Sequence, residues 1–320
     1  MLDWTDRHCR RLHRIITPHA RLYTEMITTG ALIHGPRERL LAHSPEEYPL
    51  AIQLGGNDPK DLQLCARMAE DAGYQEVNLN VGCPSDRVQS GAFGACLMKT
   101  PEVVAEAVSA MQASVSIPVT VKHRLGVDDF DSPEFLHTFM DTVASAGCEV
   151  FIVHARKAWL QGLSPKENRD IPPLRHEEVV DLKQRYPHLT IITNGGLKSV
   201  EDCQHWLNAG IDGVMIGRWA YQSPMQLGAV DHALFPHAGL TPLSAHEVVA
   251  RWLPYLNEMQ SQGNAIKHMA RHGINLFQNR PGAKQWRRWL SENLHQSGAT
   301  SAIIEHALTL VPDLTLATDE

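Results

Sequence analysis

The sequence predicts an α/β fold, a (β/α)8 TIM barrel followed by a C-terminal helical bundle. Short β-rich apolar runs alternate with stretches of helical spacing from about residue 20 to residue 220. Such alternation implies parallel strands joined by right-handed crossovers. Polar residues and glycines follow the C-terminal ends of these runs, which is where barrels of this kind keep their active sites. After Tyr221 the strand-like runs stop, so the rest of the chain is expected to be helical.

Seven runs are expected to form barrel strands. They cover residues 22–26, 49–54, 76–81, 118–123, 149–154, 189–194 and 213–217. The helices between them are expected at residues 59–72, 101–113, 132–146, 176–186 and 199–209. Thr100 and Pro101 are expected to be the N-cap and first residue of the second of these helices. Seven strands are one short of closure, so we expect a truncated first strand and a native start upstream of Met1.

The C-terminal part is predicted to be a separate helical domain. Helices are expected at residues 246–262, 265–277, 285–295 and 301–310. A stretch with Pro236, Gly239 and Pro242 connects them to the barrel. We therefore expect a barrel domain at residues 1–235 and a helical domain at residues 240–320.

Composition excludes some broad classes of protein. The formal charge of −7 argues against indiscriminate nucleic-acid binding but leaves room for a local basic patch. The chain has no run of about 18 apolar residues and no signal-peptide pattern at its start, so a cytoplasmic protein without a membrane span is expected. Its six cysteines form no C-x-x-C pair and are expected to be free thiols. We expect no metal site and a monomer.

Cys83 is the first candidate for chemistry. It follows the run that ends at Val81, in the segment Asn-Leu-Asn-Val-Gly-Cys-Pro-Ser at residues 78–85. Gly82 permits a sharp turn and Pro84 stiffens its exit, which would hold the thiol over the barrel mouth. The small residues at 90–95 suit a mobile lid. A reactive thiol and a buried core thiol are equally compatible with this pattern.

A second group of residues ends the last two strands. Asn194, Gly195 and Gly196 follow one, and Gly217 and Arg218 follow the other. Glycines allow a phosphate to approach the backbone N–H groups closely, and barrels commonly bind phosphate at these strand ends. The two glycine sites together favour a phosphate-bearing cofactor.

Other polar residues at strand ends include Gln53, Lys122 and His154. A lysine in a barrel mouth can stabilise an anionic ring or a substrate oxygen, although an exposed strand-end charge is an equally good interpretation. For His154 in isolation, a core histidine is the safer interpretation.

The C-terminal region carries a basic cluster without intervening acids. It comprises Lys267, Arg271, Arg280, Lys284, Arg287 and Arg288, interleaved with Phe277, Trp286 and Trp289. Such a cluster fits contacts with a phosphate backbone and stacked bases. A solvated basic helix face is the alternative.

Taken together, these motifs resemble those of the tRNA-dihydrouridine synthases. The resemblance lies at residues 80–85, 94–98, 121–124, 153–156 and 194–196, and it extends over nearly the whole chain. The sequence is most similar to the A type of this family, which acts on uridines 20 and 20a of the tRNA D-loop. Residues 2–7, 23–26, 155–160 and 162–169 carry that similarity.

The resemblance implies an FMN-binding barrel that reduces the C5–C6 double bond of uridine, with NADPH as reductant. Cys83 would be the proton donor. The residues expected to bind FMN are Gln53, Lys122, His154, Asn194, Gly195, Gly196, Gly217 and Arg218. The residues expected to bind tRNA are Asn80, Lys166, Arg169, Asn279, Arg280, Lys284 and Arg287. Because the target base must leave its stack to reach the flavin, a concave pocket is expected.

Three further expectations follow from the resemblance. The first strand of the family ends just before the Leu-Asp-Trp tract, which here begins at Leu2, so a chain that starts at Met1 is expected to retain FMN weakly. The nearest alternative function is an FMN barrel oxidoreductase that acts on a small molecule. The other is a catalytically impaired tRNA-binding homologue. The basic tail argues against the first alternative, and the set Cys83, Lys122 and His154 argues against the second.

Overall fold

The computed structural model describes residues 1–85, 91–239 and 241–313. The chain forms two compact units. The first, here called the barrel unit, contains Met1, Tyr23–Ser44 and Pro49–Gly217. The second, here called the helical unit, contains Leu2–Leu22, Pro45–Tyr48 and Arg218–Glu320. This division differs from the expected domain boundary near residues 235–240, because the N-terminal segment and the helices after Gly217 belong to the helical unit.

The barrel unit is built on one seven-stranded sheet. Its strands lie in chain order, and β2 to β7 pair in parallel. The strands are β1 (Leu22–Thr28), β2 (Leu50–Gly55), β3 (Glu76–Val81), β4 (Val119–Arg124), β5 (Val150–His154), β6 (Thr190–Asn194) and β7 (Gly213–Met215). All seven predicted strands are thereby confirmed, with ends that differ by at most two residues.

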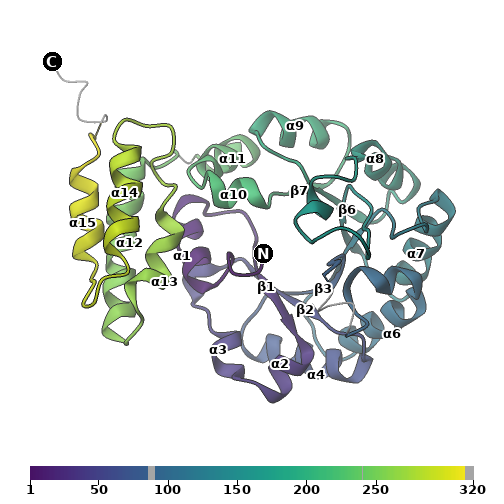
Figure 1. The fold of residues 1–320 in the computed structure, drawn as a ribbon. Coiled ribbons are helices and arrows are strands. Elements are labelled where there is room, and N and C mark those ends of the chain that lie inside the picture. Colours follow the sequence, from purple (N-terminus) through teal and green to yellow (C-terminus); the bar gives the residue numbers. More distant parts are fainter. Residues whose placement is uncertain (86–90, 240, 314–320) are drawn as a thin grey trace. The chain divides into compact units, whose positions relative to one another are not determined.

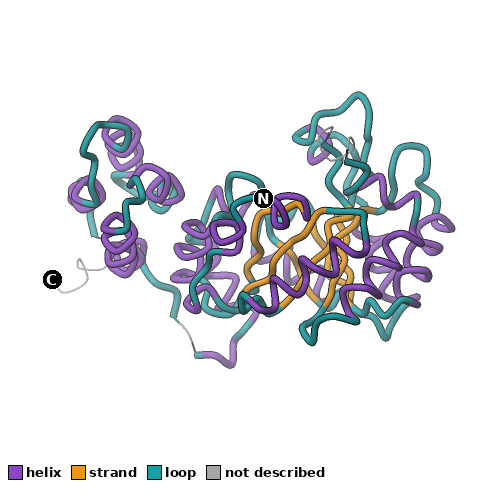
Figure 2. The backbone as a smooth tube through the Cα atoms, turned by 90° about the horizontal axis from the view of Figure 1, so that it is seen from below, coloured by secondary structure: helices purple, strands orange, loops and turns teal. Residues whose placement is uncertain are grey.

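Helices cover the outside of this sheet (Figures 1 and 2). They are α2 (Thr29–His34), α3 (Arg37–Leu41), α4 (Pro59–Asp71), α6 (Pro101–Gln112), α7 (Pro133–Ser145), α8 (His176–Arg185) and α9 (Val200–Asn208). Short 3-10 helices occur at η2 (Gly94–Lys99) and η3 (Glu167–Arg169). The alternation of strand and helix confirms the predicted α/β barrel architecture.

Side-chain caps explain where several of these helices begin. Asp58 accepts hydrogen bonds from the N–H groups of Lys60 and Asp61 at the start of α4, and Ser132 accepts one from Phe135 at the start of α7. Such caps satisfy donors that the helix itself leaves unpaired. Thr100 is the N-cap residue of α6, as predicted, but its hydroxyl donates to Leu97 O at 3.5 Å and does not cap the helix. Pro101 is the first residue of α6, as predicted.

In the described residues after Gly217, the helical unit contains helices and no strand. The helices of the unit are α1 (Arg7–Ile16), α10 (Arg218–Gln222), α11 (Gln226–Leu234), α12 (Ala245–Ser261), α13 (Ile266–Ala270), α14 (Ala283–Asn293) and α15 (Ala302–Thr309), with 3-10 helices η1 (Pro45–Glu47), η4 (Pro236–Ala238) and η5 (Arg271–Gly273). The helices expected at residues 246–262, 285–295 and 301–310 are confirmed.

The single helix expected at residues 265–277 is wrong. Helix α13 ends at Ala270, and η5 and turns follow it. Gly273 lies in this irregular segment, and only glycine fits there because a Cβ would lie 2.5 Å from the ring of the buried Trp252. Trp286, also buried, donates its Nε1–H to Gly273 O at 3.1 Å. The chain bends here so that its backbone can pack between two tryptophans.

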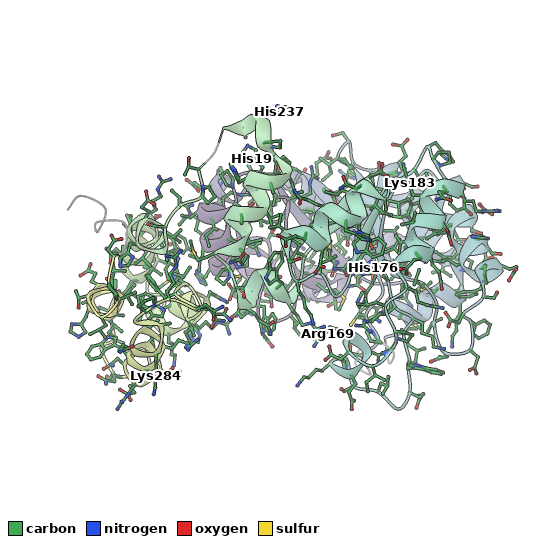
Figure 3. All side chains as sticks on the ribbon, turned by 90° about the horizontal axis from the view of Figure 1, so that it is seen from above. His19, Arg169, His176, Lys183, His237 and Lys284 are labelled. Atoms are coloured by element: carbon green, nitrogen blue, oxygen red, sulfur yellow. The ribbon has the colours of Figure 1, made fainter. Side chains whose placement is uncertain are left out.

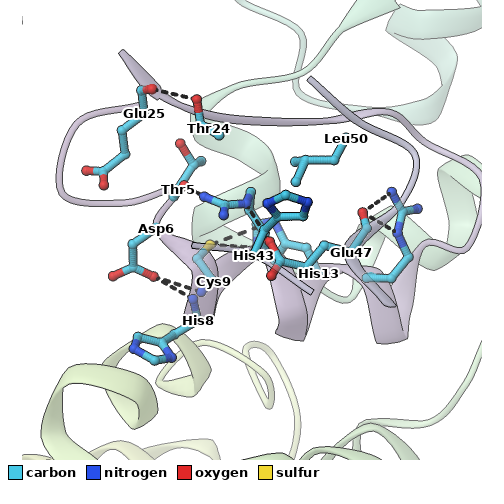
Figure 4. Close-up of polar contacts among 12 residues, drawn as sticks. Thr5, Asp6, His8, Cys9, His13, Thr24, Glu25, His43, Glu47 and Leu50 are labelled. Carbon is cyan, nitrogen blue, oxygen red and sulfur yellow. Dashed lines mark hydrogen bonds and ion pairs between the residues drawn. The ribbon is translucent and has the colours of Figure 1, made fainter. Parts of the chain in front are cut away.

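Helix α1 was not expected from the sequence. Asp6 caps it by accepting from the N–H groups of His8 and Cys9 (Figure 4). The same carboxylate pairs with Arg271 at 2.8 Å and with His272 at 3.0 Å. These hydrogen bonds hold the pKa of Asp6 below its usual range even though burial acts in the opposite direction. The N-terminal segment is thus an integral part of the helical unit.

Among the described residues, no helix combines the length and the apolar character that crossing a membrane requires.

Candidate active site and tRNA interface

The two faces of the barrel sheet differ in polarity. Laterally paired residues of parallel strands point to the same face. On one face, the register aligns the apolar residues Leu54, Leu79, Val121, Phe151 and Ile191. On the other face, it aligns Gln53 with Asn78 and Thr120, Asn80 with Lys122, and Arg124 with His154 and Asn194.

The polar face lies inside the barrel. His123 belongs to the opposite face, and its ring packs against Phe139 of α7 at 4.9 Å between centroids. That contact shows which face meets the outer helices. Burial lowers the pKa of His123 to about 4, as expected for a core histidine. The polar residues therefore line the barrel interior, and four of the expected cofactor residues (Gln53, Lys122, His154 and Asn194) share that lining.

Cys83 is held by a tight turn at the end of β3. The side-chain oxygen of Asn80 accepts hydrogen bonds from Gly82 N at 3.0 Å and from Cys83 N at 2.9 Å. The carbonyl of Cys83 accepts one from Ala95 N at 2.9 Å. The thiol is half-buried. Three hydrogen bonds thus fix the backbone on both sides of this side chain.

The predicted lid at residues 90–95 is described from Gly91 onwards. Ser90 lies outside the described residues. Gly94 and Ala95 are buried and begin η2, so this end of the segment is an ordered support for the Cys83 turn.

Arg124 connects the Cys83 turn to the loop that follows β5. Its guanidinium donates to Gly82 O at 2.8 Å and to the carbonyls of Lys157 and Asn168, both at 3.0 Å. Burial lowers the pKa of Arg124 to about 10, so the group keeps its charge at neutral pH. A buried cation therefore joins two loops that carry expected functional residues.

The side chain of Lys122 has no hydrogen-bond partner among the described residues. Burial, with a contribution from Arg124, lowers its pKa to about 7, and Cys83 acts in the opposite direction. An ammonium group that is largely withdrawn from water, as this half-buried one is, is costly unless an acceptor compensates it. The environment of Lys122 therefore fits an anionic or carbonyl-bearing ligand inside the barrel.

Gly195 and Gly196 form a backbone cradle beside His154. Both have positive φ, at +111° and +68°. A Cβ at Gly195 would lie 2.6 Å from Cδ2 of the His154 ring, so only glycine fits between them. His176 supports the cradle from α8, because its ring nitrogens contact Thr193 Oγ1 at 2.8 Å and Gly195 O at 2.9 Å.

The side chain of Asn194 reaches the neighbouring strand β7. It donates to Met215 O at 2.8 Å, and its backbone carbonyl accepts from Ala155 N at 2.9 Å. Gly217 follows β7 and ends the barrel unit. Arg218 begins α10 in the helical unit, and its contact with a phosphate stays a prediction.

The loop after β5 presents two of the expected tRNA-binding residues. Lys166 and Arg169 are exposed at η3 (Figure 3 labels Arg169). Between them, Asn168 is fully buried; its amide accepts from Trp159 N at 2.7 Å and donates to Trp159 O at 2.8 Å. One buried amide therefore holds the loop that displays both cations. Asn80, the third such residue in this unit, uses its oxygen to hold the Cys83 turn.

The basic cluster of the helical unit is largely exposed. Asn279, Arg280, Lys284 and Arg287 are all exposed to solvent, and Figure 3 shows Lys284 on the surface of the bundle. Arg288 pairs with Glu292 at 2.8 Å. The expected stacking role of the aromatic residues is wrong for Phe277 and Trp286, because both are buried in the core of the bundle.

Other basic residues of the cluster line a shallow cavity of about 350 Å³. Lys267, His268, Arg271 and His295 surround it, together with Ile274, Leu290, Ser291 and Leu294. None of the lining residues is acidic. Among the described residues, no group of three or more His, Cys, Asp or Glu side chains is arranged to hold a metal ion.

Sequence reasoning missed three interior residues. Glu76, Asn78 and Thr120 are buried and polar and lie on the same face as Gln53. The signal was present in β3, where Glu76, Asn78 and Asn80 occupy every second position. A strand buried on both faces normally has apolar residues there, so this alternation indicates a polar barrel interior.

Comparisons with known proteins show the family to which the chain belongs. A family model described as dihydrouridine synthase (Dus) matches residues 1–311. A tRNA-dihydrouridine(20/20a) synthase of Vibrio cholerae serotype O1 is 56% identical over 315 residues, which are 98% of this chain and 95% of that protein. Proteins with the same name from Salmonella typhimurium (56% identical, covering 98% of this chain and 94% of that protein) and Pasteurella multocida (55%, 97% and 94%) are similar to the same extent.

Proposed function

Because the chain belongs to the dihydrouridine synthase family, we propose that it reduces uridines 20 and 20a of the tRNA D-loop. The proposed cofactor is FMN, the reductant is NADPH and the proton donor is Cys83. The observation that carries this proposal is the fixed position of Cys83 at the mouth of a barrel with a polar, cationic interior. A small set of aligned polar groups in an otherwise apolar fold is typical of a catalytic pocket.

The barrel interior fits FMN on two counts. Lys122 supplies a positive charge with no partner among the described residues, which suits the electron-rich edge of a flavin ring. Gly195 and Gly196 expose backbone beside His154 in conformations that glycine alone adopts readily, which suits a phosphate. Gln53, His154 and Asn194 complete the proposed contacts, and Gly217 and Arg218 are proposed to reach the phosphate.

The residues of this chain would handle the proton and the charge. When bound, FMN supplies a hydride to C6 of the uracil ring after its own reduction by NADPH. Cys83 Sγ delivers the proton to C5 from the opposite face, which leaves a thiolate. Solvent then returns a proton to the Cys83 sulfur, which restores the thiol for the next reaction.

The proposed tRNA contacts come from both units. In the barrel unit, Asn80, Lys166 and Arg169 stand near the Cys83 turn or on the loop that Arg124 ties to it. In the helical unit, the exposed cluster of Asn279, Arg280, Lys284 and Arg287 would contact the phosphate backbone. Exposed basic residues on helices are well suited to such sequence-independent contacts.

A test of the function follows the oxidation of the bound flavin. The protein is loaded with FMN and reduced with one equivalent of NADPH, and unmodified tRNA is then added. We expect tRNA with uridine at positions 20 and 20a to restore the absorbance of oxidised flavin, and tRNA with cytidine at both positions to leave it reduced. Flavin that is reduced by NADPH but insensitive to both tRNAs would instead favour an oxidoreductase acting on a small molecule.

The pKa of Lys122 predicts how FMN affinity depends on pH. Below pH 7 the ammonium form is already present and binds the flavin. Above pH 7 binding must take up a proton, so affinity falls by up to about tenfold per pH unit. Without FMN, the folded lysine binds fewer protons than the unfolded one between pH 7 and its ordinary value, so the cofactor-free protein becomes more stable as pH rises.

Titrations of FMN into wild-type protein and Lys122→Met from pH 6 to pH 9 measure this effect. The ionisation of the FMN phosphate is common to both proteins and cancels in the ratio of their affinities. That ratio should approach one as pH rises. A ratio that stays constant over the whole range would show that Lys122 does not contact the flavin through its charge.

The basic cluster predicts a change in the salt dependence of tRNA binding. Each lost phosphate contact lowers the slope of log K against log salt by about 0.7 to 0.9. The double variant Lys284→Gln/Arg287→Gln should therefore lower the slope by about 1.5, measured as tRNA affinity over a series of salt concentrations.

Arg288→Gln is the matched control, because this exposed arginine on the same helix already pairs with Glu292. It should leave the slope unchanged. An equal loss in the control and in the single variant Arg287→Gln would indicate a diffuse attraction to net charge, without the specific contacts proposed.

A further inference from the structure

A continuous series of side-chain hydrogen bonds crosses the barrel interior from the Cys83 turn to Glu76. Asn80 Nδ2 donates to Gln53 Oε1 at 2.8 Å, and Gln53 Nε2 donates to Asn78 Oδ1 at 2.8 Å. Asn78 Nδ2 then donates to Thr120 Oγ1 at 2.8 Å, and the Thr120 hydroxyl donates to Glu76 Oε1 at 2.7 Å. These five residues are called the polar relay below.

The polar relay has one direction, and both of its ends determine it. At the upper end, the N–H groups of Gly82 and Cys83 can only donate, so Asn80 must present its oxygen to them. Its NH2 group must then face Gln53, and the same constraint passes to Asn78 and Thr120. At the lower end, Glu76 Oε1 accepts from the hydroxyl of Thr120. Donors and acceptors at the two ends therefore require the same orientation of all three amides.

Most members of the polar relay are buried, so a lost hydrogen bond within it is costly. Asn78 and Thr120 are 0% and 1% exposed, and Glu76 is 5% exposed, so solvent offers little replacement for a lost partner. Tyr23 also donates its hydroxyl to Glu76 Oε1 at 3.0 Å, which holds the carboxylate in place. Buried networks of this kind stabilise one arrangement when every member is satisfied.

We propose that Glu76 is a positioning residue for the reaction, acting through the polar relay on Asn80 and hence on Cys83. The carboxylate requires the same orientation of the amides as the N–H groups of Gly82 and Cys83 do, so it reinforces the hydrogen bond between the Asn80 oxygen and the N–H of Cys83. The relay also determines the directions in which the amide oxygen and nitrogen of Gln53 can form further hydrogen bonds with the flavin. The proposal rests on the proposed function of Cys83, but it makes one prediction that does not require activity.

Thr120 offers the sharpest test, because two small changes separate shape from hydrogen bonding. Thr120→Val keeps the shape and removes the hydroxyl that joins Asn78 to Glu76. Thr120→Ser keeps the hydroxyl and removes a methyl group. We expect Thr120→Val to slow the oxidation of reduced flavin by tRNA roughly tenfold, the usual size of a lost buried hydrogen bond, while flavin reduction by NADPH changes much less. Thr120→Ser should remain close to wild type.

Thr17→Val is a matched control for lost stability. Thr17 is a buried threonine of the helical unit, and its hydroxyl also donates to a buried carboxylate, that of Asp231. The control should lower the melting temperature about as much as Thr120→Val but leave tRNA-dependent flavin oxidation unchanged. Glu76→Leu, which removes the acceptor of the Thr120 hydroxyl, should reproduce the defect of Thr120→Val, and the double variant should be no slower than Thr120→Val alone, because both changes interrupt the same relay.

The reactivity of Cys83 gives a readout independent of catalysis. The other cysteines are buried except Cys96, so alkylation of a Cys96→Ala protein reports on Cys83. Thr120→Val in this background should be alkylated several-fold faster, because its turn is less firmly held, whereas Thr17→Val should not. If wild-type protein fails to modify tRNA but these alkylation rates hold, the proposed function fails and the relay stands. Equal alkylation rates in all variants, or equal loss of activity in Thr17→Val and Thr120→Val, would overturn the relay.

Discussion

Cys83→Ala is expected to lower the rate of dihydrouridine formation by about 10³-fold, within the range that general-acid catalysis contributes. The thiol sits on a turn fixed by Asn80 and by Ala95, so the backbone should keep its conformation when the sulfur is removed. FMN and tRNA affinity should therefore remain close to wild type. The measurement is single-turnover formation of dihydrouridine by the reduced, FMN-loaded protein.

Cys96→Ala is the control for this prediction. Cys96 is also half-buried and lies in the same region of the chain, but its Sγ donates to Phe93 O at 3.1 Å within η2. Its removal should change the rate by no more than about twofold, since the loss is a single weak hydrogen bond. A Cys83→Ala protein that retains more than a tenth of the wild-type rate would rule out a thiol as the essential proton donor.

Gly195→Ala is expected to weaken FMN binding by at least about 100-fold. A residue other than glycine at a φ of +111° costs about 1–3 kcal/mol of backbone strain. The new Cβ would also stand 2.6 Å from the His154 ring, so the ring must leave the position from which it is proposed to contact the flavin. Binding is measured by the quenching of flavin fluorescence, together with the melting temperature of the cofactor-free protein.

Gly210→Ala is the control that separates the effect of backbone strain from the effect of disturbing the proposed FMN site. Gly210 has a φ of +99°, close to that of Gly195, but a Cβ there would have no neighbour within 4 Å. This variant should lose stability from the same type of backbone strain and bind FMN normally. If both variants lower FMN affinity equally, the effect arises from stability alone and the cradle at Gly195 and Gly196 does not bind the phosphate.

The barrel could be predicted because each strand is short, apolar and bounded by turn residues. Glu76–Val81 was predicted to the residue, since Gly73 ends the preceding helix and Gly82 follows the strand. The expected cofactor residues Gln53, Lys122, His154 and Asn194 lie in the C-terminal halves of parallel strands, and the register places them on one face. The face to which a strand residue points depends on its position within that strand, so it can be predicted from the sequence of the strand alone.

Contacts between segments that are far apart in the sequence could not be predicted from local patterns. Helix α1 is rich in arginine and histidine, and it becomes part of the helical unit through Asp6, whose partners lie more than 250 residues away. The aromatic residue Trp286 was expected to face RNA, but Gly273 allows it to pack into the core. The polar relay depends on the lateral register of three strands, which no single strand specifies.

The most direct test of the proposed function is to map dihydrouridine in unmodified tRNA after incubation with FMN-loaded protein and NADPH. We predict new dihydrouridine at positions 20 and 20a and at no other uridine, formed about 10³-fold more slowly when Cys83→Ala replaces the wild-type protein. Oxidation of NADPH without any dihydrouridine in the tRNA, or dihydrouridine at other positions only, would contradict the proposed substrate.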